Sequence, residues 1–324
     1  MVAVDLPDEV LARMNRQLEA RHKNEQRGYL GASAIGAECE RRIWNSFHWV
    51  SKEKMEARSI KAIEDGHHSE EVMSKRLKMV EGVLLDTHNE NGHQHGFEDG
   101  HLRGHLDGLI EGVGKEPHKT HIWEHKCVNI EKFNKMSRAK IEHGEEKALE
   151  NWDIQYYAQA QVYMHHFQLE WHYMTICTPG SRDETSCLTA YNADAANYYC
   201  KERPQRIINA DKPPPKISES ASWYLCKMCP HSDNCHDEKL PQINCRTCVY
   251  STPLPDGKWM CGLHTKTITV DEQKAACEKH LFIPHLMPGQ QTDAGDDWIE
   301  YTLDNGKIIR NENAKIKTIS AGSG

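Results

Sequence analysis

The 324-residue sequence contains no long apolar run, and no stretch approaches the length that a membrane-spanning helix requires. We therefore expect no membrane partner. A secretory signal is also missing, because residues 1–27 read as an acidic-then-basic helix without the apolar core of a signal peptide. These two absences predict a cytoplasmic protein, located in the host cytoplasm if it is viral.

An excess of positive charge is likewise absent. The chain has 40 Lys and Arg residues against 48 Asp and Glu, which gives a formal net charge of −8 at pH 7. Such a protein is not coated in basic surface, so any nucleic acid must be bound by a local groove and not by the overall field. The hydrophobic fraction of 38% and the charged fraction of 27% fit a globular chain of two or more units.

Cysteine, by contrast, is abundant, but its distribution excludes a disulfide framework. Seven of the twelve cysteines lie within residues 226–277, and two pairs have the C-x2-C spacing. In a chain without a secretory signal, this spacing indicates metal binding in a reducing compartment.

The most informative feature of the sequence is a pair of short predicted strands. Both carry polar residues on a face where apolar residues are expected. Residues 104–108 and 122–126 both alternate with a period of two, and in the second strand Glu124 and Lys126 share one face. Burying them is costly unless opposite charge lies nearby. Residues 111–117 are rich in turn formers, so we expect a hairpin that brings Asp107 close to Glu124.

Two carboxylates and an amine at the end of a hairpin form a site for a hard divalent cation. Mg²⁺ prefers oxygen ligands and is usually held by one or two carboxylates. Lys126 would then orient or deprotonate a water molecule, or offset charge on a reacting phosphate.

At these residues the sequence resembles the PD-(D/E)XK nuclease superfamily, whose core is an Asp on one strand and Glu-x-Lys on the next. The resemblance implies that Asp107 and Glu124 bind Mg²⁺ or Mn²⁺, helped by the backbone carbonyl of His125, with Lys126 at the attacking water. It also implies an α/β (α+β) fold with a restriction-endonuclease-like core, in which helices flank a mixed central sheet. A C-terminal metal-bound cysteine-rich module would follow this core.

A helix predicted over residues 53–80 carries an unusual acidic residue, Glu70, on its apolar face. In RecB-like and lambda-exonuclease-like nucleases, a Gly followed four residues later by His or Glu supplies a further metal ligand, and Gly66 and Glu70 resemble that pattern. Glu71 or His67 would take the role if the helix register differed by one. The predicted apolar stripe consists of Ile63, Leu77 and Val80.

A second helix, predicted over residues 149–167, repeats amides and a phenol at four-residue steps. Several RecB-like nucleases carry Gln-x3-Tyr on the helix after Glu-x-Lys, and Gln159 and Tyr163 resemble this pair. They are candidates to position the DNA strand. Residues 131–150, rich in lysine, read either as a mobile loop that contacts phosphate or as an ordinary exposed segment.

Beyond a stiff linker at residues 211–216 stands Cys226-x2-Cys229-x5-Cys235. Three thiols need a fourth ligand, and Cys39, on a helix predicted from Ser33 to about Trp49, is the candidate. One cysteine before the nuclease core and three after it resemble the iron–sulfur arrangement of AddB-type and CRISPR-associated RecB-like nucleases. The resemblance implies a four-iron cluster on these cysteines. The alternative is zinc, with His231 or His236 replacing Cys39.

A second group of potential ligands follows. A turn around Pro253, Pro255, Asp256 and Gly257 would set Cys261 beside Cys248. We expect a zinc ribbon-like site, and the spacing alone leaves its ligands open. The candidates are Cys245, Cys248, Cys261 and either Cys277 or His280, with His264 nearby.

The sequence therefore predicts an N-terminal helix (1–30), a nuclease domain closed by an iron–sulfur cluster (31–240), a zinc-binding module (241–290) and a C-terminal hairpin with a tail (291–324). We expect a metal-dependent deoxyribonuclease, an exonuclease acting on DNA ends or single strands. The extra cysteine-rich end suggests bacteriophage DNA replication, recombination or repair, with a recombinase or helicase as partner. The alternative is a non-catalytic, metal-stabilised scaffold that binds DNA or protein. A zinc deaminase is excluded because Leu225, and not proline, precedes Cys226.

Overall fold

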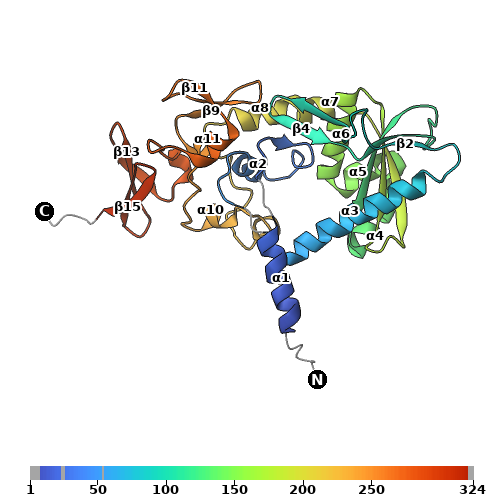
Figure 1. Cartoon of the computed structure of the whole chain (residues 1–324), viewed down its shortest axis with the longest axis horizontal. Coiled ribbons are helices and arrows are strands. Elements are labelled where there is room, and N and C mark those ends of the chain that lie inside the picture. Colours follow the sequence, from blue (N-terminus) through green and yellow to red (C-terminus); the bar gives the residue numbers. More distant parts are fainter. Residues whose placement is uncertain (1–7, 23–25, 53–54, 320–324) are drawn as a thin grey trace. The chain divides into compact units, whose positions relative to one another are not determined.

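The computed structural model describes residues 8–22, 26–52 and 55–319 (Figure 1). The chain forms two compact units, each assembled from separate segments. Unit 1 comprises Met1–Glu25, Glu53–Gly96 and His105–Ala193, and unit 2 comprises Gln26–Lys52, Phe97–Gly104 and Asp194–Gly324. Both units mix helices and strands, as the sequence predicts. No helix in the described part of the chain combines the length and apolar character needed to cross a bilayer.

Unit 1 is built on a five-stranded mixed sheet with the strand order β2-β5-β6-β7-β8. The neighbours β6 and β7 run parallel, whereas the other three adjacent pairs are antiparallel. The sheet confirms the expected mixed central sheet. Its strands are β2 (Leu84–Asp86), β5 (Gly108–Glu111), β6 (His121–Cys127), β7 (Trp171–Cys177) and β8 (Glu184–Ala190).

Helices cover both faces of this sheet (Figure 1). Trp123 of β6 packs in one apolar cluster with Met73 of α3. The next residue, Glu124, accepts a hydrogen bond from Gln159 of α6. Because successive side chains of a strand point to opposite faces, α3 and α6 cover opposite faces. The helices of unit 1 are α1 (Glu9–Arg21), α3 (Ala57–Leu77), α4 (Ile130–His143), α5 (Glu145–Trp152) and α6 (Ile154–Phe167).

The interpretation of residues 131–150 as a mobile loop is wrong, because they form α4 and α5. Asn129 caps α4 by accepting a hydrogen bond from the backbone of Lys132. Asp153 accepts hydrogen bonds from the backbone amides of Gln155 and Tyr156, so the predicted helix 149–167 is divided into α5 and α6. A few buried apolar residues hold α4 and α5 in place, namely Met136, Ala139, Ala148 and Leu149.

The predicted apolar stripe of α3 is confirmed only at Leu77, which is partly buried and packs against the cluster of Met73 and Trp123. Ile63 and Val80 are 39% and 52% exposed, and the buried residues are Ala57, Ile60, Ser69 and Met73. The helix docks on β6 through the face that carries Ser69 and Met73, which leaves Glu70 half-buried beside that face. Docking on the sheet thus decides which side of the helix is buried.

The first part of unit 2 surrounds α2 (Glu40–Phe47). This helix is shorter than predicted, and Cys39 is its N-cap residue. A three-stranded sheet has the order β1-β4-β3. The elements of this part are β1 (Leu30–Gly31), β3 (Gly96–Asp99), β4 (Leu102–His105), α7 (Ala193–Asn197), a π-helical turn (Tyr198–Glu202), α8 (Arg203–Ile208), α9 (Tyr224–Lys227) and α10 (Ser232–His236).

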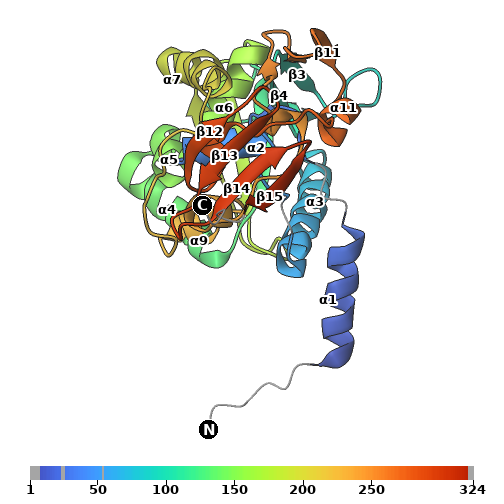
Figure 2. The same cartoon turned by 90° about the vertical axis from the view of Figure 1, so that its left-hand side faces the viewer.

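The second part of unit 2 holds two small antiparallel sheets, and Figure 2 shows the strands of the larger one side by side. The predicted hairpin at residues 304–306 is confirmed, with Gly306 at φ +79° in its turn. The elements are η2 (Cys245–Thr247), β9 (Ser251–Pro253), β10 (Trp259–Cys261), β11 (Lys266–Ile268), α11 (Val270–Ala275), η3 (Pro284–Leu286), β12 (Gln290–Ala294), β13 (Trp298–Thr302), β14 (Ile308–Glu312) and β15 (Lys315–Ile319).

A buried arginine joins the two parts of unit 2. The guanidinium of Arg246 lies 3.9 Å from the ring centroid of Trp49 and 4.7 Å from that of Trp259. It donates hydrogen bonds to the carbonyl oxygens of Phe47 (2.9 Å) and Gly28 (3.0 Å). These contacts explain why residues 26–52, distant in sequence, belong to the same unit as the C-terminal part.

Candidate active site

The hairpin of β5 and β6 brings Asp107 to Glu124. Gly108 pairs with Trp123 in an antiparallel register, so Asp107, one residue earlier, lies opposite Glu124. The backbone N–H of His125 donates a hydrogen bond of 2.7 Å to Asp107 Oδ2. The predicted hairpin is therefore confirmed. Just before β5 begins, a hydrogen bond from the backbone to a side chain extends the pairing of the two strands.

The carboxylate of Glu124 lies at the centre of a buried hydrogen-bond network. Its Oε1 accepts hydrogen bonds from Lys126 Nζ and from Gln159 Nε2, the latter at 3.0 Å. Gln159 also donates to the hydroxyl of Tyr163 (3.1 Å), which donates to the carbonyl oxygen of His105 (2.6 Å). The Gln-x3-Tyr pair of α6 thus connects Glu124 to the backbone just before Asp107.

Glu70 of α3 belongs to the same electrostatic neighbourhood. Burial and the charge of Asp107 raise its pKa to about 7, against the opposing effect of Lys126. Glu71, the alternative in the sequence, is exposed and pairs with Lys75 at 2.6 Å. His67 is also exposed, and its charge lowers the pKa of Asp107. Of the two glutamates, Glu70 is the one whose pKa is influenced by Asp107 and Lys126.

Three carboxyl groups meet a single ammonium here. Burial raises the pKa of Glu124 to about 8, helped by the charge of Asp107. Burial raises the pKa of Asp107 as well. Burial alone would lower the pKa of Lys126, but the charges of Glu124 and Asp107 outweigh it and raise that pKa. Lys126 is therefore firmly protonated, whereas Glu70, Asp107 and Glu124 hold their protons to a higher pH than ordinary carboxyl groups.

The donor set fits a divalent cation. Glu124 Oε2 is buried and has no hydrogen-bond partner among the described residues. A buried carboxylate oxygen without a partner, next to two further carboxyls, suits an ion that prefers oxygen. Within the described residues, no three His, Cys, Asp or Glu side chains are arranged as they stand to hold an ion.

Sequence reasoning missed an aromatic and basic cluster beside Lys126. The ring of Tyr156 lies 5.5 Å from Lys126 Nζ and 4.3 Å from Lys132 Nζ, which also lies over Trp152. Lys132 pairs with Asp153 at 2.6 Å. The four-residue spacing of Trp152 and Tyr156 was the available signal, but the helix boundary at Asp153 lies between them.

The first cysteine group gathers within unit 2. Cys39 caps α2, Cys226 lies in α9 and Cys235 in α10, with Cys229 in the turn between them. The pKa of Cys226 is raised by burial, and the charges of Cys39 and Cys235 act in the same direction, as they do on Cys229. Asn45 Nδ2 lies 3.8 Å from the sulfur of Cys235.

The structure does not favour one zinc alternative for this group, the one with His231. His231 is 1% exposed, and both of its ring nitrogens have partners. Nε2 lies 2.8 Å from the hydroxyl of Ser46, and Nδ1 lies 2.5 Å from that of Ser51. His231 therefore ties α2 to the cysteine-bearing loop and has no nitrogen left for a metal ion.

The second cysteine group lies around one pocket of about 440 Å³. Cys245, Cys248, Cys261 and Cys277 line it, and His264 and His280 contribute as well. The predicted turn is confirmed, because β9 and β10 form an antiparallel hairpin with Cys261 opposite Ser251.

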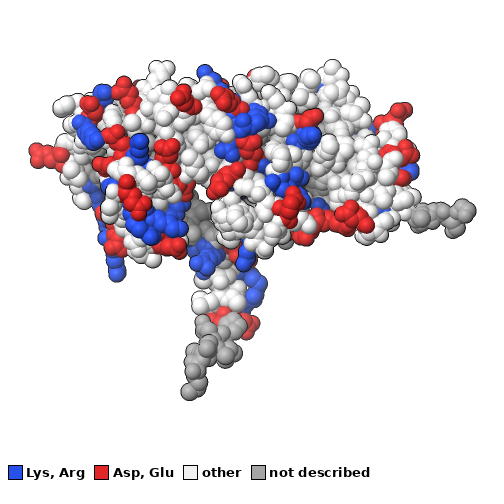
Figure 3. All heavy atoms as spheres, turned by 180° about the vertical axis from the view of Figure 1, so that it is seen from behind, with Lys and Arg blue, Asp and Glu red and all other residues white. Residues whose placement is uncertain are grey.

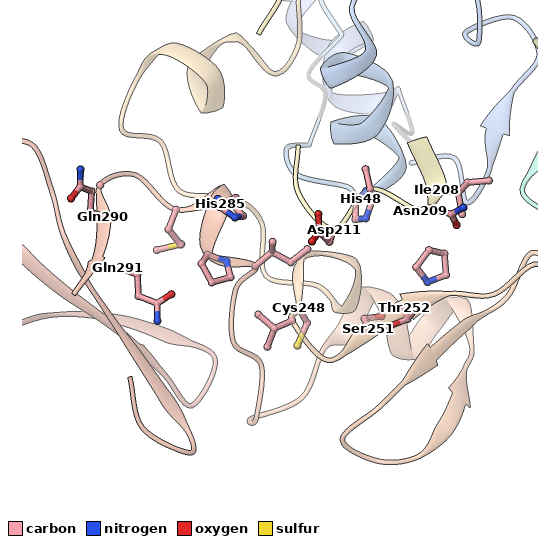
Figure 4. A pocket seen from close by; sticks show the side chains of 17 residues that line it. His48, Ile208, Asn209, Asp211, Cys248, Ser251, Thr252, His285, Gln290 and Gln291 are labelled. Atoms are coloured by element: carbon pink, nitrogen blue, oxygen red, sulfur yellow. The ribbon is translucent and has the colours of Figure 1, made fainter. Parts of the chain in front are cut away.

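Unit 2 also contains a larger cavity of about 880 Å³, shown in Figure 4. His48, Asp211, His285 and Gln291 line it together with Cys248. All of its lining residues belong to unit 2, whereas the carboxylate site belongs to unit 1.

The sequence matches no protein-family model and none of the curated proteins. The solved structures that are similar to this chain include an alkaline exonuclease from Laribacter hongkongensis. That protein is 12% identical, with a TM-score of 0.37 over 59% of this chain and 94% of its own. A phage-related exonuclease from Haemophilus somnus is 16% identical, with a TM-score of 0.33 over 45% of this chain and 69% of its own.

Proposed function

We propose that this chain is a metal-dependent nuclease that hydrolyses phosphodiester bonds in DNA. One observation carries the proposal. A buried carboxylate, Glu124, is shared between Lys126 and Gln159, keeps one oxygen without a partner, and lies next to Asp107 across a hairpin. In an arrangement that served only stability, an opposite charge would neutralise each buried carboxylate. Here, by contrast, several carboxyl groups are gathered around one ammonium.

The residues of the chain have distinct roles in this proposal. Lys126, kept protonated by its neighbours, supplies an ammonium that holds the attacking water and offsets charge on the phosphate. Gln159 fixes the orientation of Glu124 through its side-chain amide. Tyr163 links Gln159 to the carbonyl of His105 and so keeps the segment before Asp107 in place. Gln159 and Tyr163 are thus positioning residues.

The carboxylates of Glu70, Asp107 and Glu124 would hold Mg²⁺ or Mn²⁺, with the backbone carbonyl of His125 as a further ligand. When bound, the ion would supply Lewis-acid activation of water and stabilisation of developing negative charge. The fit depends on the partnerless oxygen of Glu124 and on the mutual repulsion of the three carboxyls.

The resemblance of Gly66, Glu70, Gln159 and Tyr163 to the patterns of RecB-like and lambda-exonuclease-like enzymes favours action at DNA ends. On the face drawn in Figure 3, basic side chains are interspersed with acidic ones. Together with the net charge of −8, this supports recognition by a local site and not by a broad basic surface. Bacteriophage recombination or replication, with a recombinase or helicase partner, stays a prediction.

The direct test is to incubate the pure protein with Mn²⁺ or Mg²⁺ and two DNAs, one linear and end-labelled, the other circular. We expect the label to be released as short products from the linear DNA, with the circle left intact, and we expect EDTA to stop the reaction. If the protein binds DNA tightly and cleaves neither form with either ion, the nuclease is refuted and the non-catalytic scaffold is favoured.

We further propose that Cys39, Cys226, Cys229 and Cys235 hold a four-iron cluster. Four thiols from α2, α9 and α10 and their connecting loop suit a soft metal centre. Two observations support the set: the electrostatic influence of Cys39 on Cys226 and Cys229, and the engagement of both nitrogens of His231 by serines. Zinc with His236 in place of Cys39 is the remaining alternative.

Replacing Cys39 with serine should remove the visible absorption and the iron of protein purified without oxygen. Cys200→Ser is the matched control, since Cys200 is a buried free cysteine whose pKa is influenced by no other thiol. The control should keep its colour and iron. A colourless wild-type protein that contains only zinc would contradict the cluster.

A further inference from the structure

The last four cysteines of the chain converge on one pocket from three separate segments of unit 2. Cys245 and Cys248 belong to the turn around η2, Cys261 ends β10, and Cys277 follows α11. All four line the same pocket of about 440 Å³. Segments that bring thiols together in a chain with no disulfide need another reason to converge.

The Cys245–Cys248 turn is rigid. The backbone N–H of Cys248 donates to the carbonyl oxygen of Cys245 at 3.1 Å. The side chain of Asn244 accepts hydrogen bonds from the amides of Arg246 (2.9 Å) and Thr247 (3.2 Å). Both thiols therefore project from one fixed turn, which is the backbone arrangement that a C-x2-C metal site requires.

The hairpin and helix α11 deliver the other two thiols. The β9–β10 register places Cys261 opposite Ser251, three residues beyond Cys248. Helix α11 ends at Ala275, the next residue, Ala276, has a positive φ of +56°, and Cys277 follows it. The sulfur of Cys277 then lies 3.6 Å from Nε2 of His264.

Two of these thiols contact other groups in the structure. The S–H of Cys245 donates to the carbonyl oxygen of Glu272 at 3.4 Å, and Cys277 contacts His264. As they stand, no three candidate ligands among the described residues are arranged to hold an ion. A metal binds the thiolate, which has lost its S–H donor, and a cysteine side chain redirects by rotation about a single torsion.

Cys277 fits the fourth position better than His280. His280 is 1% exposed, its Nε2 lies 3.2 Å from the hydroxyl of Thr247, and its ring packs edge-on against Phe282. Its other ring nitrogen, Nδ1, is buried without a hydrogen-bond partner among the described residues, so His280 is the competing ligand that the experiment must separate from Cys277. Cys277 is exposed, lines the pocket together with the other three thiols, and has its sulfur 3.6 Å from Nε2 of His264, which lines the same pocket.

We propose that Cys245, Cys248, Cys261 and Cys277 form a tetrathiolate site for Zn²⁺ that links η2, β10 and α11. Four thiolates suit zinc because the ion has no geometric preference of its own and accepts a tetrahedral sulfur cage. Lys266, which also lines the pocket, and His264 supply compensating charge or hydrogen bonds to the sulfurs. The site is closed by protein ligands, so its role is structural.

The test uses the full chain and Zn²⁺ alone as the probe. Elemental analysis should show that Cys277→Ser lowers the zinc content by about one equivalent per chain relative to wild type. His280→Gln and the distant Cys200→Ser should retain the wild-type content. Because only the difference is measured, zinc at any other site does not affect the result. Cobalt substitution should show thiolate-to-metal charge-transfer absorption from this site in wild type, and Cys277→Ser should lose that contribution.

Folding is checked by the circular dichroism of the full chain. If Cys277→Ser loses that signature, Cys277→His, which keeps a ligand, should restore both folding and zinc. Equal zinc in Cys277→Ser and wild type would overturn the assignment. So would loss of zinc in His280→Gln with Cys277→Ser unaffected, or a disulfide among these cysteines in protein kept reduced.

Discussion

Replacing Lys126 with alanine should reduce DNA cleavage by roughly 10²- to 10³-fold or more while the protein stays folded. Lys126 is the only described ammonium that bonds Glu124, and its protonation is enforced by Glu124 and Asp107. Without it, nothing in the network offsets the charge that develops on the phosphate. Cleavage of end-labelled DNA at saturating Mn²⁺ measures the effect, and circular dichroism verifies the fold.

Two further variants test whether the loss of cleavage comes from the lost positive charge of Lys126. One controls for lost packing, and the other controls for the removal of any lysine from this unit. Lys126→Met keeps the length of the side chain without the ammonium, and should be as inactive as alanine. Lys115→Ala removes an exposed lysine of the same unit that pairs with Glu146, and should leave cleavage unchanged. Cleavage by Lys126→Ala at the wild-type rate would refute the proposed active site.

Without a divalent cation, the free energy of unfolding should fall as the pH rises from about 5 to about 8. In the folded protein the pKa values of Glu70 and Glu124 are about 7 and about 8, above their ordinary value of 4.5. Between these limits the folded state binds more protons than the unfolded state. Their stabilising contribution is therefore complete below pH 4.5 and is lost as the pH passes the folded values, by at most about 1.4 kcal/mol per pH unit for each carboxyl.

Mg²⁺ or Mn²⁺ should reverse this loss at pH 8. The ion replaces the protons between the carboxylates, and a ligand at a hundred times its Kd adds about 2.7 kcal/mol to stability. Thermal melts at pH 5.5 and 8.0, with and without the ion, measure both effects. The ion should raise Tm at pH 8.0 and have less effect at pH 5.5, where protons compete.

Asp107→Asn should weaken both the pH dependence and the response to the ion, because it removes one of the three charges. Glu71→Gln is the matched control: Glu71 adjoins Glu70, but it is exposed and its pKa is lowered by Lys75. It should behave as wild type. A metal-free protein whose stability rises from pH 5.5 to 8.0, or that gains nothing from the ion, would contradict the carboxylate site.

The sequence predicted the elements of the site correctly where the pattern involved residues only a few positions apart. Alternation along β6 correctly separated Glu124 and Lys126 from His125, since the period of a strand is fixed by its backbone. The turn formers after β5 gave the hairpin, and with it the approach of Asp107 to Glu124. The four-residue spacing of Gln159 and Tyr163 correctly placed their side chains together.

Predictions failed where burial depended on partners distant in sequence. The stripe of α3 was assigned to Ile63, but the sheet contacts the face of Ser69 and Met73. Residues 131–150 look too polar for packed helices, yet a few contacts from Met136 and Leu149 suffice once α4 and α5 pack on each other. The hydropathy of a segment reports how many apolar residues it contains, but not which of its faces packs against another element.

The sequence by itself determined which side chains carry chemistry and which of them share a strand or helix face, because strand and helix periods and turn residues act over a few positions. Only the tertiary structure decided that Asp107 influences the pKa of Glu70 and not that of Glu71, that both nitrogens of His231 are taken by serines, and that four distant cysteines line one pocket. These outcomes depend on the packing of segments tens of residues apart, and no local pattern encodes that packing.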